Sequence, residues 1–253
     1  MIQLKTEEEI DGIRKSCHLC AQMMAEVGQI LRPGMSTWDM DKFCYDFTIA
    51  HGGKPAYLHF EGFPATACIS VNEEVIHGIP SKKRIVEEGD LVDLDLGINL
   101  NGFFSDMSRT FVIGGKTKPE WQKLNDVTAE CLDLGIEAAG RPRARIQDIG
   151  TAVQKHAEKY HYGVVREYCG HGVGLAVHED PEIPNYASPF MPNPRIREGM
   201  VLAIEPMINL GTKNIRQLGN GWTEVTADGK PSCHWENTVA ITHNGLEILT
   251  VTD

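Results

Sequence analysis

The stretch 91–111, LVDLDLGINLNGFFSDMSRTF, decides the expected fold, because it has the pattern of a β-hairpin that carries two carboxylates. The Asn-Gly dipeptide at 101–102 is a strong turn signal, since both central residues of a type I′ turn need a positive φ. A hairpin closed there places Gly97 opposite Asp106, and Asp95 projects from the same face. Asp95 and Asp106 then lie diagonally, about 7–8 Å apart by backbone. Two acids aimed at one point repel each other unless a cation lies between them, so the hairpin predicts a metal site.

Length and composition are those of an ordinary globular protein. The chain has 253 residues, 42% hydrophobic and 23% charged, which is enough for one large domain or two small ones. The net charge of -11 argues against a nucleic-acid-binding surface, which needs basic stripes. The start MIQLKTEEEI lacks the basic and apolar regions of a secretory signal, and no apolar run could cross a bilayer. We expect a cytoplasmic protein that binds neither nucleic acid nor membranes.

The cysteines do not form a recognisable framework. Their number, 7, is odd, and they are scattered along the chain, unlike those of a disulfide-stabilised domain. Cys17 and Cys20 form a CxxC pair, but both belong to an apolar stripe with helical spacing, from Ile10 to Leu31. No second CxxC follows to complete a zinc site. Small core residues are the favoured interpretation, and a metal or redox role is the alternative.

The order of helices and strands predicts an internal duplication. Capping boxes that start at Thr6 and Ser36 open two helices, after which the hydrophobic pattern takes the period of strands. The second half repeats this order, with two helices followed by strands. These second-half elements are expected at 119–139, 146–160, 164–169, 200–209, 223–226, 233–242 and 247–251.

We therefore expect an α+β fold built as one domain, residues 1–253. Its two architecturally similar halves should divide the chain at about 1–115 and 116–253, and they share no obvious residue identity.

Three segments of the second half carry isolated polar residues. His171 is flanked by glycines in GHGVG, Glu205 ends the apolar run MVLAIEP, and Glu236 stands at the entrance of WENTVAI. A glutamate inside an apolar strand is costly to bury without a partner. For any one acid, a rim or salt-bridged carboxylate is the simpler interpretation. Together with the acid pair of the hairpin, the set indicates a functional site.

The composition of this set indicates which metals it could bind. Four carboxylates and one imidazole form a hard, oxygen-rich set, which favours Mn, Fe or Co and tolerates Zn. Two divalent cations would neutralise the four carboxylates, whereas a single ion would leave excess buried negative charge. Two ions about 3.5–4 Å apart can lower the pKa of water toward neutrality. The expected chemistry is hydrolysis.

The same residues carry a family resemblance. Asp95, Asp106, His171, Glu205 and Glu236 occur in this order in the contexts DLDLG, FSDMS, GHGVG, IEPM and WENT. The chain resembles the methionine aminopeptidases of the creatinase-like pita-bread fold, and more specifically their short bacterial type I form. The likeness covers nearly the whole chain, including VNEEVIHGIP and VHEDP. It implies a pseudo-twofold fold in which a curved antiparallel sheet is covered by two helix pairs.

The resemblance implies an enzyme that removes the N-terminal methionine from nascent proteins and peptides, with a preference for a small second residue. Asp95 would bind one ion, and Asp106 and Glu236 would bridge both ions. His171 and Glu205 would complete the ligands of the other ion. Glu205 would also be the general base.

Two further histidines gain a role only through the resemblance. His77 and His178 would steer the peptide and stabilise the tetrahedral intermediate, which a neutral imidazole can do as a hydrogen-bond donor. Taken singly, each is an ordinary loop histidine. We assign no site role to the others, which are His18, His51, His59, His156, His161, His234 and His243.

The family likeness also implies an apolar pocket for the methionine side chain. The residues expected to contact the substrate there are Tyr57, Phe60, Phe63, Cys68, His77, Val177, His178 and Trp222. The aromatic members could equally be plain core. The chain departs from the family pattern at several positions, where tyrosine, tyrosine, phenylalanine, threonine and histidine are replaced by Phe60, Phe63, Val177, Gly97 and Asn237.

Two other functions stay open. A sibling peptidase that cleaves Xaa-Pro bonds usually carries an additional N-terminal domain, for which this chain has no room. A non-catalytic peptide-binding homologue usually lacks some ligands, whereas all five are present here. The expected partner is the N-terminal peptide of nascent proteins, the ribosome is a candidate partner, and the expected form is a monomer.

Overall fold

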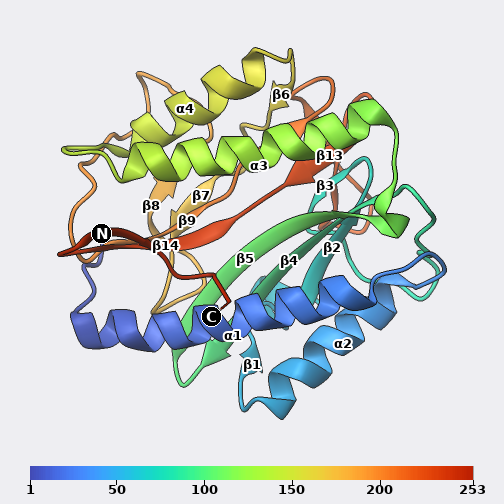
Figure 1. Ribbon diagram of the computed structural model, residues 1–253, viewed down its shortest axis with the longest axis horizontal. Coiled ribbons are helices and arrows are strands. Elements are labelled where there is room, and N and C mark those ends of the chain that lie inside the picture. The colour runs from blue at the N-terminus through green and yellow to red at the C-terminus, as the bar shows by residue number, and fades with distance from the viewer. Residues whose placement is uncertain (253) are drawn as a thin grey trace.

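Two pairs of helices flank a set of antiparallel sheets (Figure 1). The computed structural model describes residues 1–252. Helices α1 (Glu7–Ile30) and α2 (Thr37–Ala50) lie along one side of the sheets. Helices α3 (Pro119–Ala139) and α4 (Ile146–Glu158) lie along the other side. The strands therefore lie between the helix pair of the first half and that of the second.

The first helix begins at the capping box predicted from the sequence. The backbone N–H of Glu9 donates to Thr6 Oγ1 at 3.2 Å, and the backbone N–H of Thr6 donates to Glu9 Oε2 at 2.8 Å. These bonds satisfy amide groups that a helix end leaves unpaired. Cys17 and Cys20 are free thiols, both fully buried on the inner face of α1. The core interpretation of the CxxC pair is confirmed.

Four antiparallel sheets fill the space between the helices. The first contains β1 (Lys54–Pro55), β4 (Leu91–Leu100) and β2 (Ala67–Val71) in that order, with β5 (Phe103–Val112) also paired to β4. The largest sheet has the order β15 (Gly245–Ile248), β14 (Asn237–Thr242), β9 (Val201–Ile204), β7 (Gly170–Gly172) and β8 (Glu179–Ile183). The two smaller sheets are β13 (Ser232–His234), β10 (Met207–Asn209), β6 (Gly163–Val164), and β11 (Ile215–Gln217), β12 (Glu224–Thr226), β3 (Glu74–Ile76).

The β4–β5 hairpin has the predicted register. Gly97 pairs with Asp106, and Asp95 pairs with Ser108. Asn101 and Gly102 adopt φ angles of 55° and 91°, as a type I′ turn requires. The two acids of the hairpin therefore project from one face.

Two strands predicted as continuous are each interrupted at a glutamate. The expected strand 200–209 splits into β9 and β10 around Glu205 and Pro206, and proline cannot donate to a ladder. The expected strand 233–242 splits into β13 and β14 around Trp235 and Glu236. Since β9 pairs with β14 while β10 pairs with β13, both breaks fall where the chain passes from one sheet to another. The breaks place both glutamates at a junction between sheets.

The expected strand 164–169 was wrong over most of its length, because within that range only Val164, the last residue of β6, is paired, and β7 begins after it at Gly170. The short strands β1, β3, β8 and β11 were not predicted. Strands of two to five residues carry little periodic signal, and their pairing is set by distant partners.

Each helix pair buries one face against the strands. Met24 and Met40 of α1 and α2 pack with Leu94 of β4 in one core cluster. Leu124 of α3 and Val153 of α4 pack with residues of the second half in another. Burial of this kind contributes about 25 cal/mol per Å² of apolar area removed from water. The two helix pairs thus hold in place the strands from which the site residues project.

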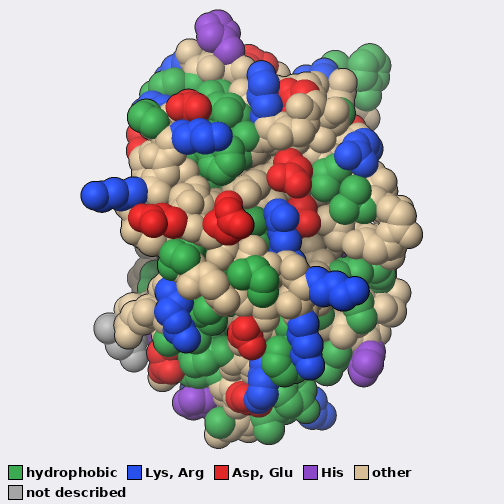
Figure 2. Space-filling model, turned by 90° about the vertical axis from the view of Figure 1, so that its right-hand side faces the viewer, with side chains coloured by type: hydrophobic (Ala, Val, Ile, Leu, Met, Phe, Trp, Pro, Cys, Tyr) green, Lys and Arg blue, Asp and Glu red, His purple; other side chains and the backbone are tan. Residues whose placement is uncertain are grey.

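Charged side chains of both signs share the visible surface. On the face shown in Figure 2, Lys and Arg side chains are interspersed with Asp and Glu. Within residues 1–252, no helix combines the length and apolar character needed to span a bilayer.

Candidate active site

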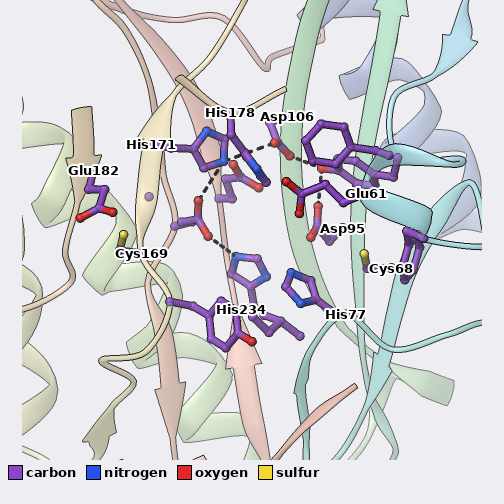
Figure 3. A pocket seen from close by; sticks show the side chains of 18 of the residues that line it. Glu61, Cys68, His77, Asp95, Asp106, Cys169, His171, His178, Glu182 and His234 are labelled. Atoms are coloured by element: carbon purple, nitrogen blue, oxygen red, sulfur yellow. Dashed lines mark hydrogen bonds and ion pairs between the residues drawn. The ribbon is translucent and has the colours of Figure 1, made fainter. Parts of the chain in front are cut away.

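A cavity of about 640 Å³ opens between the sheets and contains every residue of the predicted ligand set (Figure 3). Its size is typical of small-molecule and peptide-end sites. Asp95 enters from β4, Asp106 from β5 and His171 from β7. Glu205 and Glu236 enter from the strand breaks that follow β9 and precede β14. Residues distant in sequence are therefore brought to one place by five different strands or strand ends.

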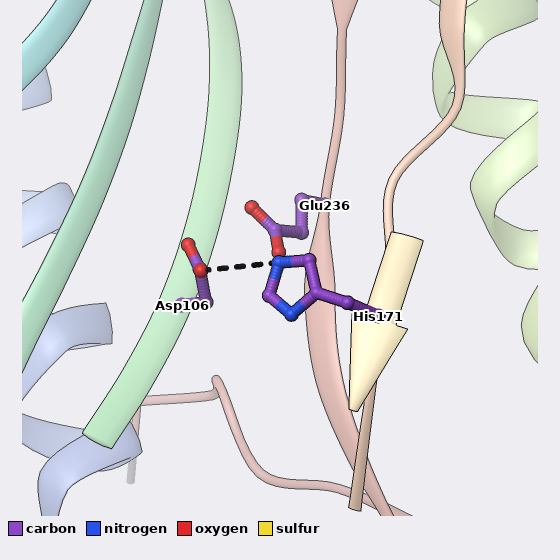
Figure 4. Close-up of side chains that lie close together, drawn as sticks. All are labelled: Asp106, His171 and Glu236. Carbon is purple, nitrogen blue, oxygen red and sulfur yellow. Dashed lines mark ion pairs between the residues drawn. The ribbon is translucent and has the colours of Figure 1, made fainter. Parts of the chain in front are cut away.

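The donor atoms lie at distances suited to metal ligands. His171 Nε2 lies 3.6 Å from Asp106 Oδ2 and 3.4 Å from Glu205 Oε1. One ligand atom each from Asp106, His171 and Glu236 lies within 4.8 Å of the others (Figure 4). Separations above 3.2 Å are long for hydrogen bonds. Two ligands of one ion, each about 2.1 Å from it, are separated by about 3.0–3.4 Å.

His171 is held as a neutral imidazole, which is the form of histidine that can bind a metal ion. Its Nδ1 lies 2.9 Å from the carbonyl oxygen of Gly172, which fixes the proton on Nδ1 and leaves the lone pair of Nε2 facing the acids. Burial, with a smaller contribution from His178, lowers the pKa of His171 to about 3. The imidazole is therefore neutral near pH 7.

Two buried oxygens of the site have no hydrogen-bond partner. Glu205 Oε1 and Glu236 Oε1 are both in this condition, although buried polar atoms are normally satisfied. Unpaired carboxylates are costly to bury, and a bound cation would supply the partner and the positive charge that these oxygens lack. The donor set and its orphaned oxygens therefore fit a divalent ion.

The acids also raise one another's pKa. Burial and then the charge of Asp95 raise the pKa of Asp106 to about 8. Burial raises the pKa of Asp95 to about 6, although His234 opposes the shift. Burial and Asp106 raise the pKa of Glu236 well above its ordinary value, and burial does the same for Glu205. So many acids cannot all ionise together unless a cation neutralises them.

Neighbouring polar groups hold two of the expected ligands, Asp106 and Glu236, in place. Thr238 Oγ1 donates to the carbonyl oxygen of Asp106 at 2.7 Å, which ties β14 to β5. Arg109 donates to the carbonyl oxygen of Glu236 and to Asn237 Oδ1, the latter at 2.7 Å. Asn237, one of the departures from the family pattern, thus helps to fix Arg109 beside the site.

Both histidines expected to contact substrate line the cavity. The ring of His178 lies 4.3 Å from that of His171 and meets Phe60 edge-on at 5.3 Å. The ring of His77 meets Tyr168 edge-on at 5.2 Å. Burial lowers the pKa of His77 to about 4 and also lowers that of His178. Both are therefore neutral near pH 7 and can donate one N–H each.

The expected pocket residues divide into two groups. Phe60, Phe63, Cys68 and Trp222 line the cavity, as does Tyr57. The rings of Phe63 and Trp222 meet edge-on at 5.2 Å, an arrangement that stabilises aromatic walls.

Val177 differs from these residues. It is buried in the same apolar cluster as Phe63 and Cys68, but it is not among the residues that line the cavity. Its side chain therefore supports the pocket wall.

His234 belongs to the site, although we expected no site role for it. It is 1% exposed and lines the cavity. Its Nδ1 lies 3.4 Å from Asp93 Oδ2 and its Nε2 lies 3.8 Å from Glu205 Oε2. Burial would lower the pKa of His234, but Asp93 and other acids raise it to about 9. The available signal was its position two residues before Glu236, across the break that separates β13 from β14.

Tyr57 also lies differently from its expected place. It was expected only as a pocket wall, yet its hydroxyl group donates to Asp95 Oδ1 at 2.7 Å and also contacts Asp106 Oδ1. Burial, followed by the charges of Asp106 and Asp95, raises the pKa of Tyr57. The phenol is therefore protonated and faces the acids.

A buried centre of four carboxylates and a neutral imidazole, beside an apolar cavity, defines the class of a metal-dependent hydrolase. Comparison with known proteins gives the family. The model of metallopeptidase family M24 matches residues 11–243, and this chain belongs to that family. Family membership confirms the predicted hydrolase of peptide bonds and its use of divalent metal.

Individual relatives agree with this assignment. The methionine aminopeptidase of Treponema pallidum (strain Nichols) is 52% identical over 250 residues, which cover 99% of this chain and 96% of that protein. The crystal structure of methionine aminopeptidase from Rickettsia prowazekii has a TM-score of 0.94 at 35% identity, covering 99% of this chain and 100% of that one. This likeness confirms the expected α+β pita-bread fold. The prolidase from Pyrococcus furiosus has a TM-score of 0.77 at 27% identity, and the match covers 99% of this chain but 66% of the prolidase.

Proposed function

We propose that this chain removes the N-terminal methionine from peptides and nascent proteins. The observation that carries the proposal is the convergence of all five donors in one cavity, with His171 Nε2 3.6 Å from Asp106 and 3.4 Å from Glu205. The 52% identity to a methionine aminopeptidase over nearly the whole chain supports methionine as the released residue. The apolar wall that contains Phe63 and Trp222 suits a thioether side chain.

The proposed ligands are Asp95, Asp106, His171, Glu205 and Glu236, and the proposed cofactors are two divalent ions. Two ions would balance the charge of four carboxylates. The hard donor set favours Mn, Fe or Co and accepts Zn. Such ions act as Lewis acids and lower the pKa of water toward neutrality.

Residues of the chain itself would transfer the proton, stabilise the intermediate and position the substrate. Glu205 is the proposed general base, because its carboxylate lines the cavity and burial raises its pKa, which suits a group that must hold a proton. His178 and His77 are neutral donors on the cavity wall and would stabilise the oxyanion of the tetrahedral intermediate. The aromatic wall would exclude water from the methionine side chain and orient the scissile bond.

The proposed setting is the cytoplasm, where new polypeptides emerge. The N-terminal peptide of a nascent chain is the proposed partner, with the ribosome as a further candidate. A monomer is the proposed form, because all the site residues named here come from one chain.

The two alternatives are less well supported. The match to a prolidase leaves a third of that longer chain unmatched and has the lower TM-score of 0.77. A non-catalytic binding role gives no reason for a complete set of five converging donors.

The test compares peptides that differ at the cleaved bond. The purified protein, supplied with Mn²⁺ or Co²⁺, is incubated with Met-Ala-Ser, Met-Phe-Ser, Leu-Pro-Ser and acetyl-Met-Ala-Ser, and the products are identified by mass. We expect free methionine from Met-Ala-Ser, much less from Met-Phe-Ser, and no cleavage of the blocked peptide. Faster cleavage of Leu-Pro-Ser would favour the Xaa-Pro alternative and contradict the proposal.

A further inference from the structure

The phenol of Tyr57 lies against two of the proposed metal ligands. Its hydroxyl group donates to Asp95 Oδ1 at 2.7 Å and also contacts Asp106 Oδ1. Tyr57 is 8% exposed. The backbone holds it there, because β1 pairs with β4 and the N–H of Ala56 donates to the carbonyl oxygen of Gly97 at 3.0 Å. Tyr57 is therefore fixed directly over Gly97.

Gly97 provides the space that this arrangement needs. A Cβ atom at position 97 would lie 2.9 Å from Tyr57 Cε1 and 3.0 Å from Tyr57 Cζ, which is closer than packed carbon atoms approach. Gly97 does not have a positive φ, so its backbone conformation does not demand glycine. The close approach of the Tyr57 ring does, together with that of Ala56 Cβ, which would lie 3.0 Å from the added atom.

The hydroxyl group and a cation would use the same oxygens. A phenol has one proton, and here its oxygen atom lies between Asp95 Oδ1 and Asp106 Oδ1. Asp106 presents its other oxygen, Oδ2, to His171. Asp95 Oδ1 and Asp106 Oδ1 are thus both turned toward the phenol, and a cation bound through either atom would meet the Tyr57 hydroxyl group beside it.

We propose that Tyr57, accommodated by Gly97, is a positioning residue that competes with a divalent cation for Asp95 and Asp106. This inference rests on the proposed function, since it takes the two acids as metal ligands. The competition would affect the ion that Asp95 is proposed to bind. The cluster of Asp106, His171 and Glu236 does not include Asp95, so the two sides of the centre differ in the ligand atoms that they offer.

Tyr57→Phe tests the competition, because it removes the hydroxyl group and keeps the ring. Chelator-treated protein is titrated with Mn²⁺ by calorimetry. Hydrogen bonds to charged groups are strong enough that the most weakly bound ion should bind roughly 10- to 100-fold more tightly in the variant. The melting temperature of the metal-free variant should fall, while that of the metal-saturated variant should match wild type, because the bond is lost only from the metal-free state.

Two further variants make the result specific. Tyr168→Phe removes another phenol of the same cavity, one that donates to Glu224 at 3.0 Å, and it should leave Mn²⁺ affinity unchanged. Gly97→Ala should displace the Tyr57 ring and tighten binding in the same direction. In the Tyr57→Phe background, Gly97→Ala should add little, because both changes act through one hydroxyl group.

The outcomes separate the two proposals. Unchanged or weaker Mn²⁺ binding by folded Tyr57→Phe would overturn the competition, and weaker binding would instead make the phenol a supporting ligand. A wild-type protein that binds neither Mn²⁺, Co²⁺ nor Zn²⁺ would contradict the proposed metal centre itself.

Discussion

His171 and Glu205 face each other because β7 pairs with β9 in a register that sets His171 opposite Ala203, two residues before Glu205. Glu205 directly follows the end of β9 at Ile204, and its Oε1 lies 3.4 Å from His171 Nε2. In the hairpin of β4 and β5, Asp106 lies opposite Gly97, and Asp95 lies two residues away on the same face. One pair of residues from each of two sheets thus contributes to the centre.

Asp106→Asn should abolish metal retention and activity together. The change keeps the size of the side chain but removes the charge of a buried proposed ligand that contacts both sides of the centre. Metal content and methionine release from Met-Ala-Ser are measured on the purified variant. Asp46→Asn, at an exposed position of α2, is the control and should behave as wild type. Turnover near the wild-type rate in Asp106→Asn would exclude this residue as a ligand.

His178→Ala should separate catalysis from metal binding. The ring lies beside His171 but is proposed to contact the substrate. Loss of one donor to an oxyanion typically lowers kcat by about 10²–10³-fold, so kcat should fall by that amount while metal content stays constant. The exposed His243 supplies the control variant, His243→Ala. A folded His178→Ala protein that had lost its metal would reassign His178 as a ligand.

The metal-free protein should lose stability between pH 6.5 and 8. The folded-state pKa of Asp106 is raised to about 8 and that of His234 to about 9. In this range the folded protein therefore binds protons that the unfolded chain releases, so the free energy of unfolding falls as the pH rises. The buried histidines with lowered pKa have the opposite effect, but only below about pH 6.5.

Saturation with Mn²⁺ should reverse this trend, because the ligands must be deprotonated to bind metal. Thermal unfolding at several pH values, with and without Mn²⁺, measures both slopes. A metal-free stability that stays level or increases over this range would show that the acids are not protonated in the folded protein.

Val177→Phe should sharpen the preference for methionine. Val177 packs behind the pocket with Phe63 and Cys68, and a larger ring there would push the wall into the cavity. Changes of this size in apolar pockets are worth about 10–200-fold in kcat/KM. The ratios of kcat/KM for Met-Ala-Ser, Leu-Ala-Ser and Phe-Ala-Ser, compared with those of wild type, give the result. Equal ratios in both forms would show that residue 177 acts only in core packing.

Local sequence signals were enough to predict the parts of the site that depend on neighbouring residues. The turn at 101–102 set the register of the hairpin, and therefore the shared face of Asp95 and Asp106. The capping boxes located the starts of α1 and α2. These features depend on a few adjacent residues, so the chain alone contains their signal.

Features that depend on packing between distant segments could not be predicted in the same way. The contact of Tyr57 with the acids depends on the space left by Gly97 on another strand. The site position of His234 depends on Asp93 and Glu205, which are distant in sequence. The division into halves at about residue 115 and the presence of two ions stay predictions.

Metal titration of methionine release is the most direct test of the central claim. Protein stripped by chelation is titrated with Mn²⁺ or Co²⁺, and free methionine from Met-Ala-Ser is measured at each step, with Asp106→Asn titrated in parallel. We expect no release without metal, a rise that reaches a plateau as the centre fills, and no response from the variant. Full release by the stripped protein, or none at any concentration of Mn²⁺, Co²⁺, Fe²⁺ or Zn²⁺, would contradict metal-dependent removal of methionine.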